Sequence, residues 1–178
     1  MPSQESPEYL RSCLVDVFPV SPNLDSSLKK NTGFIRKVRT SLNEASLPSL
    51  LKDISTLTLV KYLSEIVSAL TEGFTQCKST ASLLVGVEVS SALFQRFGPE
   101  FCGPLLSNML HGVANPPKST LNALTAENRQ REAKARLERQ RIVIRIIIEL
   151  WLAGVFRSSL DLVDYDLPSF ATVKNKAG

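Results

Sequence analysis

The chain has 178 residues, of which 43% are hydrophobic and 21% charged, and its formal net charge is +4 at neutral pH. This length suits one compact domain, and the hydrophobic fraction is large enough to fill a core, which argues against a wholly disordered chain. The three cysteines are widely spaced and form no CxxC pair, which favours neither a disulfide framework nor a zinc site. We therefore expect the protein to work in a reducing compartment, the cytoplasm. We also expect it to bind no cofactor.

The sequence predicts no membrane segment. The first twenty residues contain acidic side chains and several prolines but no apolar run, unlike a signal peptide. The most apolar stretch, residues 142–156, is too short to cross a bilayer and includes Arg145 and Glu149. We therefore expect a soluble protein that does not bind membranes.

Residues 1–20 are interpreted as a lead-in segment and residues 21–174 as a single helical domain. Ser21 and Pro22 predict the start of the first helix, because serine suits the cap and proline suits the first helical position. The predicted apolar stripe of this helix consists of Leu24, Leu28, Ile35, Val38 and Leu42. Gly33 is expected to weaken its middle.

Four further helical segments are predicted in the next stretch of chain. A short helix follows Pro48 and ends near Ser55, and the clearest amphipathic pattern runs over residues 59–74. Residues 81–97 are apolar over a wider arc, and Gly98 with Pro99 ends that helix. A further stripe covers residues 101–113.

The C-terminal part is predicted to contain a flexible basic loop near residues 114–128 and a long helix capped by Thr125. Residues 142–156 are apolar on nearly all sides, which predicts a place at the centre of a helical stack. Residues 158–173 are expected to add one short helix. Seven residues are predicted to be buried: Leu63, Ile66, Leu70, Leu93, Phe97, Ile146 and Leu150.

These patterns predict an all-α fold, a HEAT-like stack of antiparallel helical hairpins. No segment alternates as a half-buried strand does over several residues, and the short links between helices favour antiparallel neighbours. The sequence has no fixed repeat period, so any repeats are degenerate.

The chain carries few residues suited to catalysis. Its one histidine, His111, is expected on a surface turn, and Cys102 lies among core-type residues. Neither a Gly-rich phosphate loop nor a metal-ligand spacing occurs. We therefore predict a protein that is not an enzyme, and a hydrolase built on Cys102 and His111 is the remote alternative.

Charge is concentrated in one stretch, where residues 118–145 hold eight basic and three acidic side chains. The plain interpretation is an exposed helix with ordinary pairs such as Glu132 with Arg136, and the alternative is a face for a protein partner or for RNA. No aromatic residue in the stretch offers a base-stacking platform. The candidate RNA or partner face comprises Lys29, Lys30, Arg36, Lys37, Arg129, Arg131, Lys134, Arg136 and Arg139.

Several stretches of the chain resemble one family. They are residues 24–40 (LDSSLKKNTGFIRKVRT), 59–70 (LVKYLSEIVSAL), 93–97 (LFQRF) and 141–156 (RIVIRIIIELWLAGVF). They are similar to the second up-frameshift proteins, which are the scaffolds of nonsense-mediated mRNA decay, and they most resemble the fungal members of that family. The match falls on the first of the family's domains related to the middle domain of translation initiation factor 4G.

The resemblance implies a non-enzymatic scaffold or adaptor domain that spaces and presents partner-binding domains. We separately expect the chain to be a monomer. Other decay factors would be its partners through the parent protein, with weak RNA contact at most. The family's docking sites for those factors lie in other parts of the parent protein, so no partner-binding residue is carried over. The alternative from another class is an RNA-binding module that uses the arginine-rich helix. The segment of residues 115–139 departs from the family pattern, because it is longer and more basic than the corresponding segment of the family.

Overall fold

The computed structural model describes residues 18–77, 79–114 and 125–156. Apart from an isolated bridge between Asp25 and Leu57, the regular structure of these residues is helical. The helices are α2 (Leu28–Thr40), α3 (Leu47–Thr56), the 3₁₀ turn η1 (Val60–Tyr62), α4 (Leu63–Gln76), α5 (Thr80–Phe97), α6 (Pro99–Val113) and α8 (Ala126–Leu152). The predicted all-α class is therefore confirmed. Most of the lead-in segment and of the basic loop, and the predicted last helix, lie outside the described residues.

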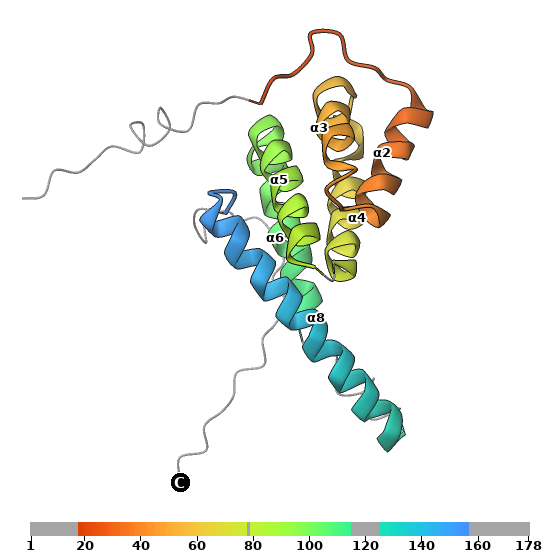
Figure 1. Ribbon diagram of the computed structural model, residues 1–178, viewed down its shortest axis with the longest axis vertical. Helices are drawn as coiled ribbons and strands as arrows, with labels where there is room; N and C mark the ends of the chain where they lie inside the picture. Colours follow the sequence, from red (N-terminus) through yellow and green to blue (C-terminus); the bar gives the residue numbers. More distant parts are fainter. Residues whose placement is uncertain (1–17, 78, 115–124, 157–178) are drawn as a thin grey trace, which may run out of the picture.

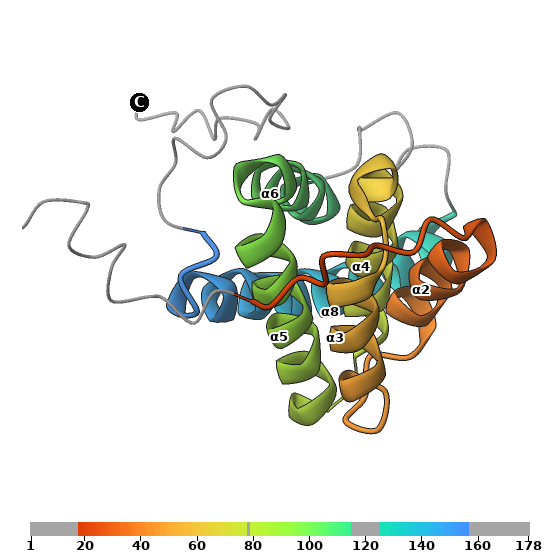
Figure 2. The ribbon, with the colours of Figure 1, turned by 90° about the horizontal axis from the view of Figure 1, so that it is seen from above.

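Alternate helices pack side by side, which is the arrangement of a helical solenoid. Helix α2 packs on α4 and α4 on α6, while α3 packs on α5 in a second row (Figures 1 and 2). Helix α8 packs on α6 and also contacts α4 and α5, so it crosses one face of the stack. This arrangement agrees with the predicted HEAT-like stack.

The first helix begins later than predicted. It starts at Leu28, and Leu24 and Leu28 are exposed, so the predicted start at Ser21 and Pro22 is wrong. The reason lies in Asp25, whose backbone pairs with the segment around Leu57 and whose carboxylate accepts a hydrogen bond from the Ser27 N–H at 2.8 Å. The chain before Leu28 is therefore held extended along the end of α3.

Helix α4 also differs at its start from the predicted pattern. Leu59 is fully buried but precedes the 3₁₀ turn, and the regular helix begins at Leu63. Leu63 is only partly buried, so its predicted burial is wrong, because the turn rotates it away from the stripe that Ile66 and Leu70 continue. Leu93, Ile146 and Leu150 are buried as predicted, and Phe97 packs against the core while remaining partly exposed.

Glycine lets α2 and α4 approach closely. A Cβ atom at Gly73 would lie 2.5 Å from the carbonyl oxygen of Val38 and 3.0 Å from Cδ1 of Leu42. Both neighbours belong to the α2 side of the core, and one of them is backbone, which cannot rotate away. Gly73 lies inside α4 and sets the spacing of the two helices.

Within residues 18–77, 79–114 and 125–156, helices pack on one side of α8 only, which differs from the central position predicted for residues 142–156. Val143, Ile146 and Leu150 are buried, but Ile144, Ile148, Trp151 and Leu152 are exposed. Helices α4, α5 and α6 cover only one side of α8 (Figure 2). An apolar composition on all sides therefore does not correspond here to burial on all sides.

Candidate macromolecule-binding surfaces

The described residues offer no assembled nucleophile and base. Cys102 is buried and His111 exposed, and both lie on α6. Their separation of nine residues along one helix corresponds to about 13 Å, far beyond hydrogen-bond reach. Burial raises the pKa of the Cys77 thiol, which keeps it protonated and unreactive at neutral pH. In the same described ranges, no group of three or more His, Cys, Asp or Glu side chains is placed to hold a metal ion.

Half of the predicted basic residues on α2 are engaged by carboxylates. Lys30 Nζ lies 2.5 Å from the Asp25 carboxylate, and this contact lowers the pKa of Asp25 and raises the pKa of Lys30. Lys37 Nζ lies 2.8 Å from the Asp53 carboxylate and donates a further hydrogen bond to Ser49 Oγ. Lys29 and Arg36 are exposed and remain the outward-facing charges of this helix.

The first half of α8 projects beyond the other helices and is exposed to solvent on most sides (Figure 1). Thr125 caps it as predicted, accepting a hydrogen bond from the Asn128 N–H. Arg131 pairs with Glu127 at 2.6 Å, and Glu132 pairs at 2.6 Å with Arg139 rather than with the predicted Arg136. The positive charge of this half is therefore partly neutralised along the helix itself.

The two basic sets come from different helices, and α4 packs against both of them. The ion pairs of Lys30 and Lys37 on α2 and of Arg131 and Arg139 on α8 do not join the two helices. The nine-residue face stays a prediction, and the structure divides it into an α2 part and an α8 part.

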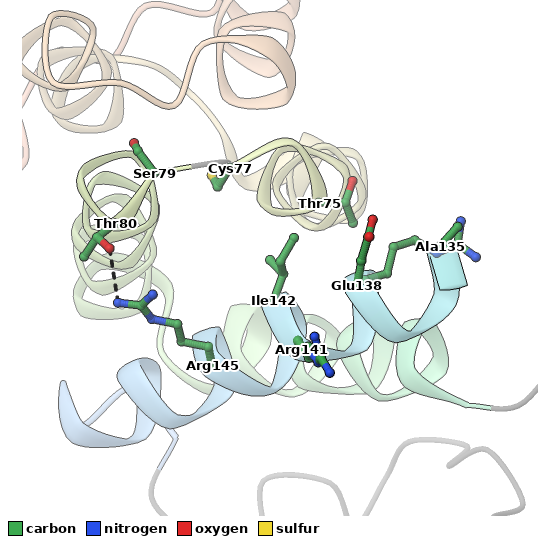
Figure 3. Close-up of a pocket in the computed structure, with 10 residues that line it drawn as sticks. Thr75, Cys77, Ser79, Thr80, Ala135, Glu138, Arg141, Ile142 and Arg145 are labelled. Carbon is green, nitrogen blue, oxygen red and sulfur yellow. Dashed lines mark hydrogen bonds between the residues drawn. The ribbon is translucent and has the colours of Figure 1, made fainter. Parts of the chain in front are cut away.

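A cleft of about 620 Å³ lies where the end of α4, the start of α5 and the middle of α8 meet (Figure 3). Arg139, Arg141 and Arg145 line it from α8, and Arg145 Nη2 donates a hydrogen bond of 3.4 Å to Thr80 Oγ1. Thr80 is the first residue of α5, whose N-terminus carries partial positive charge. Arginine beside a helix N-terminus is chemistry suited to phosphate or carboxylate.

The cleft contains residues that the sequence-based face left out. Arg141 and Arg145 belong to the basic stretch of residues 118–145 but not to the predicted nine-residue face. Their spacing of four residues, which places both on one helical side, was the available signal. The position of Arg145 beside Thr80 depends on how α8 crosses α5 and had no signal in the sequence.

Comparison with known proteins gives a consistent set of relatives. The chain is 37% identical over 162 residues to nonsense-mediated mRNA decay protein 2 of Schizosaccharomyces pombe, covering 86% of the chain and 15% of that relative. It is 38% identical over 162 residues to the protein of the same name in Saccharomyces cerevisiae, covering 89% of the chain and 14% of that relative. The chain thus spans about one seventh of the length of these relatives. No protein-family model matches it.

Two solved structures resemble the fold. One is the N-terminal mIF4G domain of S. cerevisiae Upf2, a protein involved in the degradation of mRNAs containing premature stop codons. It superposes with a TM-score of 0.72 at 38% identity, over 89% of this chain and 48% of the solved chain. The other is the first MIF4G domain of human UPF2, with a TM-score of 0.55 at 27% identity, over 75% of this chain and 38% of that one. No helix among the described residues is long and apolar enough to span a membrane.

Proposed function

We propose that this chain, which belongs to the family of nonsense-mediated mRNA decay protein 2, also called Upf2, is a non-enzymatic scaffold domain of a decay factor. The observation that carries the proposal is the exposure of the first half of α8, which projects from the packed stack while the second half of this 27-residue helix packs on α4, α5 and α6. A rise of 1.5 Å per residue makes it about 40 Å long, long enough to hold binding surfaces apart.

In this proposal the stack acts as a rigid spacer in the cytoplasm. The domain is a monomer that works with other decay factors through the parent protein, and its exposed charges orient or contact a macromolecule. A rigid core supports such a role because Phe34, Phe74 and Phe101 are fully buried and join α2, α4 and α6. The domain itself transfers no chemical group.

A chimera tests the scaffold role. The chain replaces the matching part of S. cerevisiae Upf2, and the half-life of a reporter mRNA with a premature stop codon is measured. We expect the chimera to restore rapid decay. An unfolded control, in which Leu70→Asp disrupts the core, should not. A folded chimera that leaves the reporter stable, or a substrate turned over by the purified chain, would contradict the proposal.

A second candidate function is RNA binding, favoured by the three arginines at the cleft beside the start of α5. If phosphates bind there, the affinity for a labelled single-stranded RNA, measured by fluorescence anisotropy, should fall steeply as salt rises. The charge reversals Arg141→Glu and Arg145→Glu should reduce the affinity at least tenfold.

A second pair of reversals locates the RNA on α8. Arg131→Glu with Lys134→Glu changes the same number of charges on the projecting half of the helix. Loss of binding in this pair alone would place RNA on the projecting half and exclude the cleft. The absence of binding even at low salt would remove the RNA-binding candidate and leave the scaffold proposal standing.

A further inference from the structure

Ser79 and Thr80 are neighbouring hydroxyl residues at the start of α5 with different surroundings. Both are exposed, and they follow the turn that joins α4 to α5. The Ser79 hydroxyl caps α5, because it accepts a hydrogen bond from the Ser82 N–H at 3.1 Å. The Thr80 hydroxyl points the other way, towards α8, where it accepts the hydrogen bond from Arg145 Nη2 (Figure 3). Of these two hydroxyl groups, that of Thr80 is the one that faces the arginines of α8.

The cleft around Thr80 has room and positive charge for an anion. Three arginines of α8 line it, whereas its one acidic lining residue, Glu138, lies towards Thr75 and away from Thr80 (Figure 3). Arg145 Nε lies 4.0 Å from the Glu149 carboxylate, which is the limit of an ion pair. The Arg145 guanidinium is therefore available for a stronger acceptor, and the cleft of about 620 Å³ has space for a phosphoryl group.

The chemistry of the cleft suits a phosphate that is attached to the chain itself. None of the described residues that line the cleft is aromatic, so it offers no platform for a nucleic-acid base. A guanidinium group binds phosphate oxygens in a bidentate manner, and a phosphorylated side chain at a helix N-terminus opposite arginine gains charge-assisted hydrogen bonds. We propose that Thr80 is a phosphorylation site and that Arg145 holds its phosphate in the cleft, which ties the start of α5 to α8.

The modification requires a protein kinase and ATP. Thr80 Oγ1 forms a bond to the γ-phosphorus of ATP, the bond from that phosphorus to the bridging oxygen of ADP breaks, and the hydroxyl proton passes to the catalytic base of the kinase. Thr80 is exposed, and Ser79 before it has an extended backbone with φ −110° and ψ 155°. A kinase therefore has to open only the first turn of α5, and helix ends open at little cost in free energy.

Thermal unfolding tests whether Arg145 holds the phosphate. The full chain is produced with phosphothreonine incorporated in place of Thr80, and its Tm is compared with that of the unmodified chain. We expect the phosphate to raise Tm by roughly 3–6 °C, because it adds charge-assisted hydrogen bonds between α5 and α8. Arg145→Gln should remove at least half of this rise. In the unmodified chain, the same substitution at an exposed position should change Tm by less than about 2 °C.

The matched control is phosphoserine incorporated in place of Ser79. It brings the same charge to the N-terminus of α5, but the Ser79 side chain points away from Arg145 (Figure 3). Its effect on Tm should therefore be the same with and without Arg145→Gln. Equal dependence of both phosphorylated chains on Arg145 would overturn the proposal. So would a phosphothreonine at position 80 that lowers Tm, or one whose effect on Tm survives Arg145→Gln in full.

Mass spectrometry tests whether the modification occurs in a cell. The chain is expressed in S. cerevisiae, purified with phosphatases inhibited and digested with trypsin, which releases residues 79–96 as one peptide. We expect fragment ions that place a phosphoryl group on Thr80. An unmodified peptide, or a phosphoryl group on Ser79 alone, would overturn the proposal. A phosphate at Thr80 would also exclude an RNA phosphate from the cleft. That consequence rests on the RNA-binding candidate, whereas the Tm and mass measurements do not, so the two can fail separately.

Discussion

The two sides of α8 carry nearly the same chemistry and have different environments. Ile146 and Ile148 are the same residue type two positions apart, yet Ile146 is fully buried and Ile148 is half exposed. Helices α4, α5 and α6 pack on the side of Ile146. An apolar side chain therefore indicates only that a surface is suited to burial. Whether the side chain is buried depends on whether another helix packs against that surface.

The largest expected effect separates these two sides directly. Ile146→Ala should lower the free energy of unfolding by about 2–5 kcal/mol, because it removes buried methyl groups and leaves a cavity. Ile148→Ala should change it by less than about 0.5 kcal/mol, as is usual for a surface substitution. Urea unfolding of the two variants measures both values. Similar losses at both positions would mean that α8 is covered on its outer side within this chain.

A smaller effect is expected where two helices of the core approach through glycine. Gly73→Ala should cost about 1–3 kcal/mol, because the added methyl group would collide with the Val38 carbonyl oxygen. Gly33→Ala is the matched control, since a Cβ there meets no atom within 4 Å. That control should instead stabilise the protein by about 0.5–1 kcal/mol through helix propensity. If Gly73→Ala also stabilised it, the close contact of α2 and α4 would be wrong.

The smallest effect belongs to the exposed ion pair before α2. The hydrogen bond from Lys30 lowers the pKa of Asp25 in the folded protein. The Asp25 carboxylate therefore stabilises the fold at pH values above its unfolded pKa, and this stabilisation is lost as the pH falls through its folded pKa. The pKa of Lys30 is raised in the folded protein, so the stabilisation by its ammonium group is lost only at strongly alkaline pH. Asp25→Asn should therefore lower Tm slightly near pH 6 and leave it unchanged near pH 2. An equal change at both pH values would show that the effect does not come from the ion pair of Asp25 with Lys30.

Sequence patterns predicted the helices best where local chemistry defines an end. Gly98 adopts a positive φ of 61° and Pro99 begins α6, as the Gly-Pro pair indicates. Thr125 caps α8 for the same local reason. The prediction failed at Ser21 and Pro22, where equally good capping residues are overruled by the pairing of Asp25 with the segment near Leu57. That contact joins residues more than thirty positions apart and leaves no local pattern.

The candidate surfaces divide in the same way. The nine-residue basic face was predicted from charge alone, and the structure adds that Lys30, Lys37, Arg131 and Arg139 already have carboxylate partners. Two of those partners lie within five residues in sequence, whereas Asp53 comes from the next helix. The cleft with Arg141 and Arg145 was not predicted, because it forms only where α8 crosses the start of α5.

The sequence by itself determined the helical class, most helix ends and the residues able to form a core, because period, capping and propensity act over a few neighbouring positions. Tertiary structure alone decided which side of α8 is buried, how closely Gly73 lets α2 approach, and which charges meet at the cleft. The physical reason is that burial and charge pairing are properties of two surfaces in contact. The sequence of one helix, whether it is apolar on one side or on both, specifies only its own surface and not the surface that packs against it.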